Sequence, residues 1–302
     1  MRIAMITNPN SSVISTIQAK AAAALLDQHP DFRVLRRIGD PAALAVPSAG
    51  DGGATRVAVI VDCETTGLDP TKDRIIEIAM RRCRFDASGA IVEIGTVRTW
   101  LEDPGFSVPP EISRITGLHD EDLAGQAIDT DAATEMLFSA DVVIAHFAGF
   151  DRPFAEARFP GAAGLAWACS LSEVPWVALG FKGRSLGYLL AQMGWFYRPH
   201  RAQSDVAALM HLLSHRCNDG ERVLAKLVNK AERPTVRIDA RLPDYSLRFA
   251  FKGRGYNWDA PGKSWWLEVD EQAVESEQLW IQRLGHLRPA HSTPVSWRER
   301  HK

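Results

Sequence analysis

Acidic side chains stand directly after the most apolar strand-like segment of the chain. Residues Val57–Val61 are five consecutive apolar residues, a pattern typical of a strand buried on both faces, and the segment D-C-E-T-T-G follows at once. Because side chains alternate along a strand, Asp62 and Glu64 point to the same side and can converge on one cation. Carboxylates without a His or Cys pair select Mg²⁺ or Mn²⁺ over zinc. A solvated strand end is the alternative, but the buried strand and the T-T-G turn favour a metal site.

Two further acids stand near the ends of other expected elements. Asp151 comes shortly after the apolar run Val142–Ala145, although an Asp ahead of Pro153 is more often a helix cap. Asp205 lies in the first turn of a helix expected over Gln203–Arg216, with an apolar face behind it. In isolation, an Asp at a helix start needs no function. Each of these acids is nevertheless placed where a strand or helix ends.

The loop before this helix contains His200, five residues ahead of Asp205. Its ordinary pKa of about 6.5 suits a general base for water, and a surface histidine is the equally good alternative. Asp62, Glu64, Asp151 and Asp205 together would repel one another without cations, so the set implies bound metal. Two divalent ions roughly 3.5–4 Å apart can activate a water and stabilise the leaving oxygen in phosphodiester hydrolysis.

The elements that must position these residues predict an α/β domain with helices packed on a mixed sheet. Strands are expected over 57–61, 74–85 and 90–101, the last two joined by a D-A-S-G hairpin turn. Further helices are expected over 14–26, 130–139, 153–158 and 185–193, and a short buried strand over 142–145. The predicted organisation is an N-terminal extension and linker (1–55), a catalytic domain (56–216), a connecting helix (217–232), a small α+β module (233–287) and a flexible tail (288–302).

Charge and composition bound the class of protein. The 302 residues carry a formal net charge of −2, which hides a block over 57–215 with 13 basic and 21 acidic residues between mildly basic ends. The four cysteines are widely spaced, no apolar run approaches the roughly 20 residues that span a bilayer, and the first residues lack a signal-peptide pattern. We therefore expect a cytoplasmic protein with no membrane partner.

Tryptophan gathers at the C-terminal end, where five of the nine Trp fall in the last 45 residues. Basic and aromatic residues alternate there, a mixture that suits unpaired nucleic acid through stacking. A small module also needs large side chains for its core, so a structural role is favoured for the set, with an exposed member aiding substrate binding. Adjacent strand residues face opposite ways, so at most one of the W-W pair is core. The candidate accessory contacts are Arg254, Tyr256, Trp258, Trp265 and Trp266.

The segment 56–216 resembles the DEDDh branch of the DEDD superfamily of 3′–5′ exonucleases, which includes the proofreading epsilon subunit of bacterial DNA polymerase III and ribonuclease T. The resemblance rests on V-D-C-E-T-T-G-L at the first strand and on H-R-A-Q-S-D, which fits the H-x-A-x-x-D form of that branch. The segment Ile115–Leu118 resembles the family's threonine–glycine turn. One motif departs from the pattern, because Phe147 stands where N-x-x-F-D has Asn, which puts sugar and terminal-base selectivity in doubt.

The resemblance implies a ribonuclease-H-like fold and a role for each candidate residue. It assigns metal binding to Asp62, Glu64, Asp151 and Asp205, and the general-base role to His200. It places the 3′-terminal nucleotide against Thr65, Thr66, Gly67 and Leu68, with Phe150 close by.

The implied function is a 3′–5′ exonuclease with two divalent ions, Mg²⁺ or Mn²⁺, that releases nucleoside 5′-monophosphates from single-stranded or frayed DNA ends. DNA is favoured over RNA, and a DNA polymerase or repair partner is suggested. The alternatives are a ribonuclease that trims RNA 3′ ends and a nucleic-acid-binding accessory protein with a weak nuclease centre.

Overall fold

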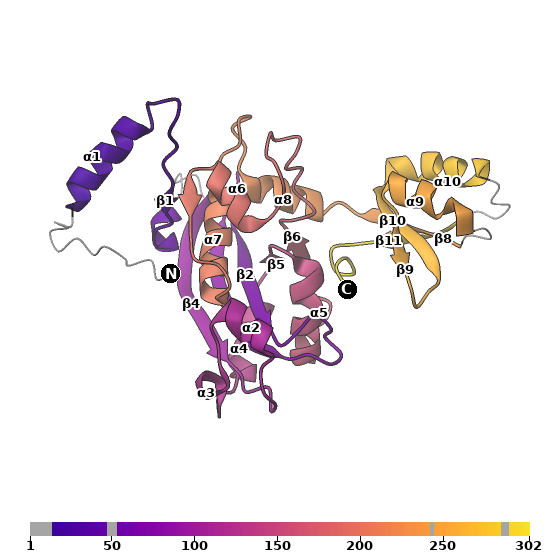
Figure 1. Cartoon of the computed structure of the whole chain (residues 1–302). Coiled ribbons are helices and arrows are strands. Elements are labelled where there is room, and N and C mark those ends of the chain that lie inside the picture. Colours follow the sequence, from indigo (N-terminus) through magenta and orange to yellow (C-terminus); the bar gives the residue numbers. More distant parts are fainter. Residues whose placement is uncertain (1–13, 47–52, 242–244, 285–289) are drawn as a thin grey trace, which may run out of the picture.

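A five-stranded mixed sheet forms the centre of the larger part of the molecule (Figure 1). In this computed structural model, which describes residues 14–46, 53–241, 245–284 and 290–302, the strand order is β4-β3-β2-β5-β6. The first three strands pair antiparallel, whereas β2, β5 and β6 are parallel. The strands are β2 (Arg56–Thr65), β3 (Ile75–Phe85), β4 (Ile91–Leu101), β5 (Val142–Ala145) and β6 (Trp167–Cys169).

Helices cover both faces of this sheet, because the central strands are apolar on both sides. On β2, Ala58 and Ile60 belong to one core cluster, and Val59, Val61 and Cys63 belong to the other. Cys63 therefore faces the core. The first cluster is completed by α6 (Leu186–Gln192), α7 (Ala202–Ser214) and α8 (Val223–Ala231), and the second by α4 (Thr130–Phe138) and α5 (Ala148–Arg158). The predicted α/β domain, a mixed sheet flanked by helices, is confirmed.

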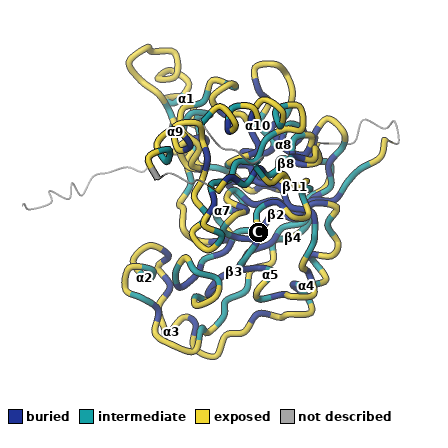
Figure 2. Tube along the Cα trace, turned by 90° about the vertical axis from the view of Figure 1, so that its right-hand side faces the viewer, coloured by how far each residue is buried: buried dark blue, intermediate teal, exposed yellow. Residues whose placement is uncertain are grey.

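The expected hairpin joins β3 and β4. The Asp86 carboxylate accepts hydrogen bonds from the Ser88 and Ala90 backbone N–H groups, and Gly89 has a φ of +72°, which a side chain would strain. Two short helices that the sequence reading missed, α2 (Pro110–Thr116) and α3 (Asp120–Leu123), follow β4. The central strands form the buried middle of the fold, while α2 and α3 lie at its exposed edge (Figure 2).

The N-terminal extension reaches the catalytic domain through a short strand. The expected helix is present as α1 (Thr16–Leu26), which has no buried residue and stands apart from the sheet (Figure 1). Beyond it, β1 (Arg36–Arg37) pairs in parallel with β7 (Trp195–Phe196), and the 3₁₀ turn η1 (Pro41–Leu44) packs beside α7. Of the described extension, the second half is the part that packs against the catalytic domain. Residues 1–13 of the predicted extension lie outside the described residues.

The C-terminal module, defined here as residues 235–295, is a second, smaller α+β unit (Figure 1). Its four strands are antiparallel in the order β11-β8-β10-β9, and its two helices pack on one face around Ile238, Phe251 and Ile281. The elements are β8 (Thr235–Ala240), η3 (Tyr245–Leu247), α9 (Arg248–Arg254), β9 (Asn257–Asp259), β10 (Ser264–Asp270), η4 (Glu271–Ala273), α10 (Val274–Arg283) and β11 (His291–Val295). None of the helices within the described residues is long and apolar enough to cross a membrane.

The expected flexible tail over 288–302 is wrong for residues 290–302. Residues His291–Val295 form β11 and pair with β8, and the chain then returns to the larger sheet, where Trp297 O accepts from Trp167 N at 3.0 Å. Arg300 is 6% exposed and forms ion pairs with Glu173 and Glu268. The Pro residues and scattered charges predict flexibility only if the charges are solvated, and here the charge of Arg300 is neutralised inside the fold.

Candidate active site

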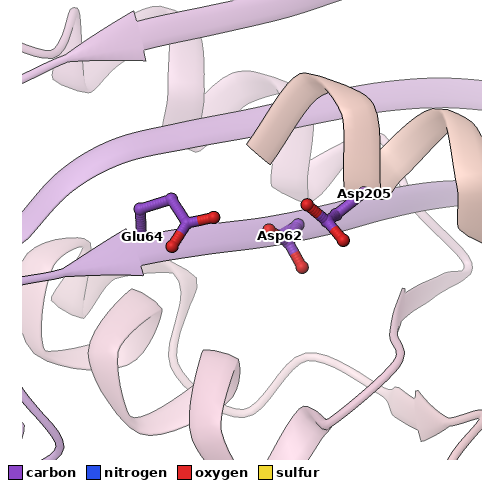
Figure 3. A group of neighbouring side chains, drawn as sticks. All are labelled: Asp62, Glu64 and Asp205. Carbon is purple, nitrogen blue, oxygen red and sulfur yellow. The ribbon is translucent and has the colours of Figure 1, made fainter. Parts of the chain in front are cut away.

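Strand β2 delivers two carboxylates because it is longer than its parallel neighbour. Its pairing with β5 covers only Ala58–Ile60, so the end of β2 extends beyond β5 at the carboxyl edge of the sheet. Asp62 and Glu64 lie on this free end and are half-buried, on the face of the sheet where α7 packs (Figure 3). The alternation expected of a strand thus brings both acids to one side.

Helix α7 supplies the third carboxylate from above this strand end (Figure 3). One oxygen each from Asp62, Glu64 and Asp205 lies within 4.8 Å of the others, and we call these three residues the carboxylate site. Both oxygens of Asp205 are held: Oδ1 accepts from the Tyr197 hydroxyl at 2.7 Å, and Oδ2 accepts from the His200 N–H at 2.9 Å. Because the loop ahead of α7 is bonded to Asp205, the helix start and the site form one unit.

The fourth expected ligand, Asp151, lies next to the carboxylate site but outside the group of three. It is buried in the first turn of α5, where its Oδ1 accepts a hydrogen bond from the Cys63 N–H at 3.0 Å. That N–H lies on the part of β2 that β5 does not cover, so the carboxylate replaces a missing strand partner. Its charge still contributes to raising the pKa of Asp62. Helix α5 begins at Ala148, five residues earlier than expected, so Phe150 and Asp151 lie within it and Pro153 is internal.

Two residues at the site escaped the sequence analysis. Glu77 on β3 is 1% exposed and holds the first turn of α7, accepting from Ala202 N at 3.0 Å and pairing with Arg201 at 2.9 Å. Tyr197 fixes Asp205 as described above. An acid within the apolar segment Ile75–Met80 was the available signal for Glu77, because an unpaired buried carboxylate is costly. Tyr197 had no comparable signal.

The carboxylate site has raised pKa values because its acids are both buried and crowded. Burial, followed by the charges of Asp151 and Asp205, raises the pKa of Asp62 well above its ordinary range. Burial and the charges of Asp205 and Glu77 raise the pKa of Glu64 to about 8. Burial likewise raises the pKa of Asp151 to about 7, although the bond from Cys63 opposes it. Protons are therefore bound more tightly here than at ordinary carboxyl groups.

His200 lies in the loop beside this site with its side chain exposed. Its φ of +66° is a left-handed conformation that non-glycine residues seldom adopt, and its backbone N–H is bonded to Asp205. The structure thus fixes the backbone of His200 against the carboxylate site.

Contacts of its own residues fix the conformation of the T-T-G turn after β2. The Thr66 hydroxyl donates to Asp73 Oδ1 at 3.2 Å, and a Cβ at Gly67 would lie 2.4 Å from Asp73 Oδ2, so only glycine fits there. The Thr65 hydroxyl donates to the Gly67 carbonyl. Leu68 is 84% exposed at the end of the turn. Of the five expected substrate contacts, Leu68 thus projects most freely.

The aromatic pair on α5 presents an apolar surface close by. Phe150, an expected substrate contact, is half-buried, and its ring stacks on that of Phe147 with centroids 6.3 Å apart. Phe147 is 55% exposed. The position where the family pattern has Asn therefore carries an exposed ring in this chain.

The five candidate contacts of the C-terminal module separate into two groups. Tyr256 is 3% exposed, and Arg254 forms a bidentate ion pair with Glu277, so both residues contribute to the fold of the module itself. Trp265 packs in the module core, whereas Trp266 lies on the other face with the Arg237 guanidinium 4.7 Å from its ring centroid. The opposite orientation of adjacent Trp residues is confirmed. Trp258 is 50% exposed. An accessory nucleic-acid contact stays a prediction for Trp258 and Trp266.

The donor set fits divalent metal. Three carboxylate oxygens within 4.8 Å provide hard ligands, and no salt bridge neutralises any of the three acids among the described residues. Burial and mutual repulsion raise the pKa values of Asp62 and Glu64, and the charge of Arg201 offsets this only in part at Glu64. Acids gathered at the carboxyl end of the central strand of a mixed sheet are suited to hold divalent metal, and bound divalent metal can promote phosphodiester hydrolysis.

Comparison with known proteins establishes the family. Residues 59–213, just over half the chain, match the exonuclease (RNase_T) family, and the chain belongs to it. It is a nuclease of the hydrolase class, with an exonuclease domain similar to that of epsilon subunits.

Similar proteins match about half of the chain. The epsilon subunit of DNA polymerase III from Treponema pallidum is 28% identical over 185 residues, which are 58% of this chain and 83% of that protein. A PolC-type DNA polymerase III from Thermotoga maritima is 31% identical over 153 residues, 49% of this chain but 11% of the polymerase.

Among solved structures, exonuclease X in complex with 5′-overhanging duplex DNA is 23% identical with a TM-score of 0.38, over 51% of this chain and 89% of the other. Escherichia coli exonuclease I in complex with an oligonucleotide is 16% identical with a TM-score of 0.43, over 81% of this chain and 64% of the other. The match to the family model establishes the family of this chain. The fold of the chain is the one given above by its strand order.

Proposed function

We propose that the protein is a 3′–5′ exonuclease that removes nucleoside 5′-monophosphates from single-stranded or frayed DNA ends. The observation that carries the proposal is the carboxylate site, in which β2 and α7 bring three acids within 4.8 Å in a chain of the exonuclease family. The names of its relatives, which include DNA polymerase III subunits, favour DNA as the substrate and a polymerase or repair complex as the partner.

Asp62, Glu64 and Asp205 would hold divalent metal, Mg²⁺ or Mn²⁺, with Asp151 beside them as the fourth ligand of a two-ion site. Such ions, when bound, neutralise the charge that develops on the phosphate and favour the hydroxide form of water. Tyr197 and the His200 N–H hold Asp205 in place, so that both of its oxygens keep their orientation.

His200 would take the proton from the attacking water. The side chain is exposed in a loop whose backbone is fixed to Asp205, which lets the imidazole approach the reacting phosphate while its main chain stays in register. The attack forms a bond between the water oxygen and phosphorus, and the bond from phosphorus to the 3′ oxygen of the next nucleotide breaks. The turn Thr65–Leu68 and Phe150 would lie against the terminal nucleotide.

The direct test incubates the pure protein with 5′-labelled single-stranded DNA, duplex DNA and RNA in Mg²⁺, Mn²⁺ or EDTA. We expect a ladder that shortens from the 3′ end of DNA and disappears with EDTA. Faster shortening of RNA would instead identify an RNA-trimming enzyme, and binding without cleavage in Mn²⁺ would identify an accessory protein.

The role of His200 has its own test. H200A is expected to lower the rate at saturating DNA by a factor of at least about 100, the usual contribution of a general base, with unchanged oligonucleotide affinity. The control is H29A, which removes an exposed histidine near the end of α1. An unchanged rate in H200A would remove this residue from the mechanism.

A further inference from the structure

We propose that the N-terminal extension completes a second binding pocket, which holds a phosphate and the adjoining nucleoside of the strand whose end occupies the carboxylate site. The proposal rests on the nuclease function above and adds a substrate-binding region that lies partly outside the matched exonuclease segment. We call it the arginine pocket, and its basic residues are Arg37, Arg81, Arg198 and Arg201.

Three separate parts of the chain build this cavity of about 690 Å³. They are residues 37–41 of the extension, strands β3 and β4, and the segment 197–207 that contains the start of α7. Its volume lies within the range of small-molecule and cofactor sites. The extension is fixed there by backbone hydrogen bonds from Arg36 N to Gly194 O at 2.8 Å and from Ile38 N to Phe196 O at 3.0 Å. The pocket is therefore part of the ordered fold.

The charge of the pocket is opposite to that of its surroundings. Four guanidinium groups face two lining acids, Asp40 and Glu77, whereas the segment 57–215 carries 13 basic and 21 acidic residues. Arg81 and Arg201 are already engaged, the first with the Gly95 carbonyl at 2.9 Å and the second with Glu77. Positive charge concentrated in a hollow attracts anions.

Arg37 and Arg198 are the two cations free to take a ligand. Neither has an ion pair or a side-chain hydrogen bond to another described residue, and both are exposed. A planar guanidinium matches the oxygens of a phosphate through paired N–H donors. Two such groups in one hollow therefore favour a phosphate over an uncharged ligand. The apolar lining of Ile38, Pro41 and Val97 leaves room for a sugar or base beside the phosphate.

The arginine pocket and the carboxylate site share a wall. Tyr197 and Arg201 both line the pocket, and both bond to Asp205, through the Tyr197 hydroxyl at 2.7 Å and the Arg201 N–H at 3.3 Å. Glu77 also lines the pocket, and its charge contributes to raising the pKa of Glu64. A strand with one phosphodiester at the carboxylates would thus reach the arginines with a neighbouring nucleotide.

The test compares R37A/R198A with R98A/R283A, which removes two exposed arginines outside the pocket. Anisotropy with a 5′-fluorescent single-stranded DNA oligonucleotide, in EDTA so that no cleavage occurs, is repeated over a range of NaCl. We expect R37A/R198A to weaken binding at least about tenfold at low salt. The slope of log affinity against log salt should fall by about 1.4, as expected for two lost contacts to a single strand. Equal affinity and slope in the two double variants would overturn the proposal.

Two further measurements separate this inference from the nuclease function. Hydrolysis of the 4-nitrophenyl ester of thymidine 5′-monophosphate, which is too short to extend into the pocket, should be the same in R37A/R198A and the wild type. If the wild type cleaves neither DNA nor the ester while R37A/R198A still binds single-stranded DNA more weakly than the wild type, the pocket proposal is supported and the nuclease proposal is wrong. Calorimetry with thymidine 5′-monophosphate in EDTA tests the other phosphate source. Binding that is lost in R37A/R198A, with strand affinity unchanged, would make the pocket a mononucleotide site and overturn the strand proposal.

Discussion

The carboxylate site and the C-terminal module contain half-buried or buried acids in opposite electrostatic situations. In the carboxylate site, Asp62, Glu64 and Asp205 lie within 4.8 Å of one another, and none of them has a salt bridge to a described residue. In the module, the Glu277 side chain is 10% exposed but is met by Arg254 at 2.8 Å and by the Tyr256 hydroxyl at 3.3 Å. Acids without a basic partner can bind cations, whereas acids paired with a basic side chain stabilise the small fold of the module.

The same contrast explains why the aromatic residues of the module are mostly structural. The ring of Trp280 lies beneath the Arg254 guanidinium at 4.6 Å and stacks with Tyr256 at 5.9 Å. A unit of this size buries little area, so large rings and paired charges supply much of its stability. Aromatic residues on the outside of that network, Trp258 and Trp266 among them, remain available to a ligand.

The largest expected effect comes from neutralising one acid of the carboxylate site. D62N should lower hydrolysis at least about a hundredfold, because several kcal/mol of charge stabilisation at the phosphate depend on the ligand set. In EDTA the same variant should unfold about 2–4 °C higher than the wild type, because the amide removes a crowded, desolvated charge. Thermal unfolding at pH 8.5 measures this. A lower unfolding temperature in EDTA would show that the charge of Asp62 is compensated after all.

The matching change in the module should act in the opposite direction. E277Q leaves Arg254 without its partner and should cost about 2 kcal/mol of unfolding free energy, reduced from the value for a fully buried pair because Arg254 is partly exposed. Calorimetric unfolding gives the value, and E275Q, on the exposed face of the same helix, is the control. Hydrolysis of the short 4-nitrophenyl ester should be unchanged in both. Stabilisation by E277Q would remove the distinction between the two regions.

Local patterns predicted the elements and acids of the catalytic domain well. The apolar run 57–61 and the hairpin turn at Asp86 identified β2, β3 and β4, since burial on both faces and turn chemistry are local signals. The carboxylate site followed, since Asp62 and Glu64 lie two residues apart on one side of a strand and Asp205 lies in the first turn of a helix. The roles assigned to His200 and Asp151 stay predictions.

Other features depend on contacts between distant residues and could not be predicted in the same way. Strand β11 forms only by pairing with β8, about 55 residues earlier, and Pro294 argued against a strand. Arg300 is ordered by Glu173 and Glu268, neither of which is near it in sequence. Helix α9 was missed because the segment Lys252–Trp258 was interpreted only by its mixture of basic and aromatic side chains, whereas Gly255 ends a helix there with a φ of +99°. The arginine pocket likewise requires the pairing of β1 with β7.

The smallest expected effect concerns a group from which the fold excludes charge. His146 follows β5, and its Nε2 must carry the proton because its partner at 2.9 Å, the Arg184 carbonyl, can only accept. Nδ1 then accepts from the Ser170 hydroxyl at 2.8 Å. Burial lowers the pKa of His146 to about 4, below the ordinary value of 6.5.

A lowered histidine pKa stabilises the folded state fully above the ordinary value, and this contribution is lost as the pH falls from 6.5 toward 4. Because the ring is partly exposed, we expect the loss to be about 1 to 2 kcal/mol over that window.

Urea unfolding of the wild type and H146Q at pH 7 and pH 5 isolates the contribution of His146. The wild type should lose more unfolding free energy between the two pH values than H146Q does. The exposed His291 provides the control variant H291Q, which should keep the wild-type pH dependence. If H146Q and the wild type lose the same free energy, the acid sensitivity of the domain arises elsewhere. The carboxylate site and the neighbouring Asp151 would then be the only places in the described catalytic domain where we have identified charges that oppose folding.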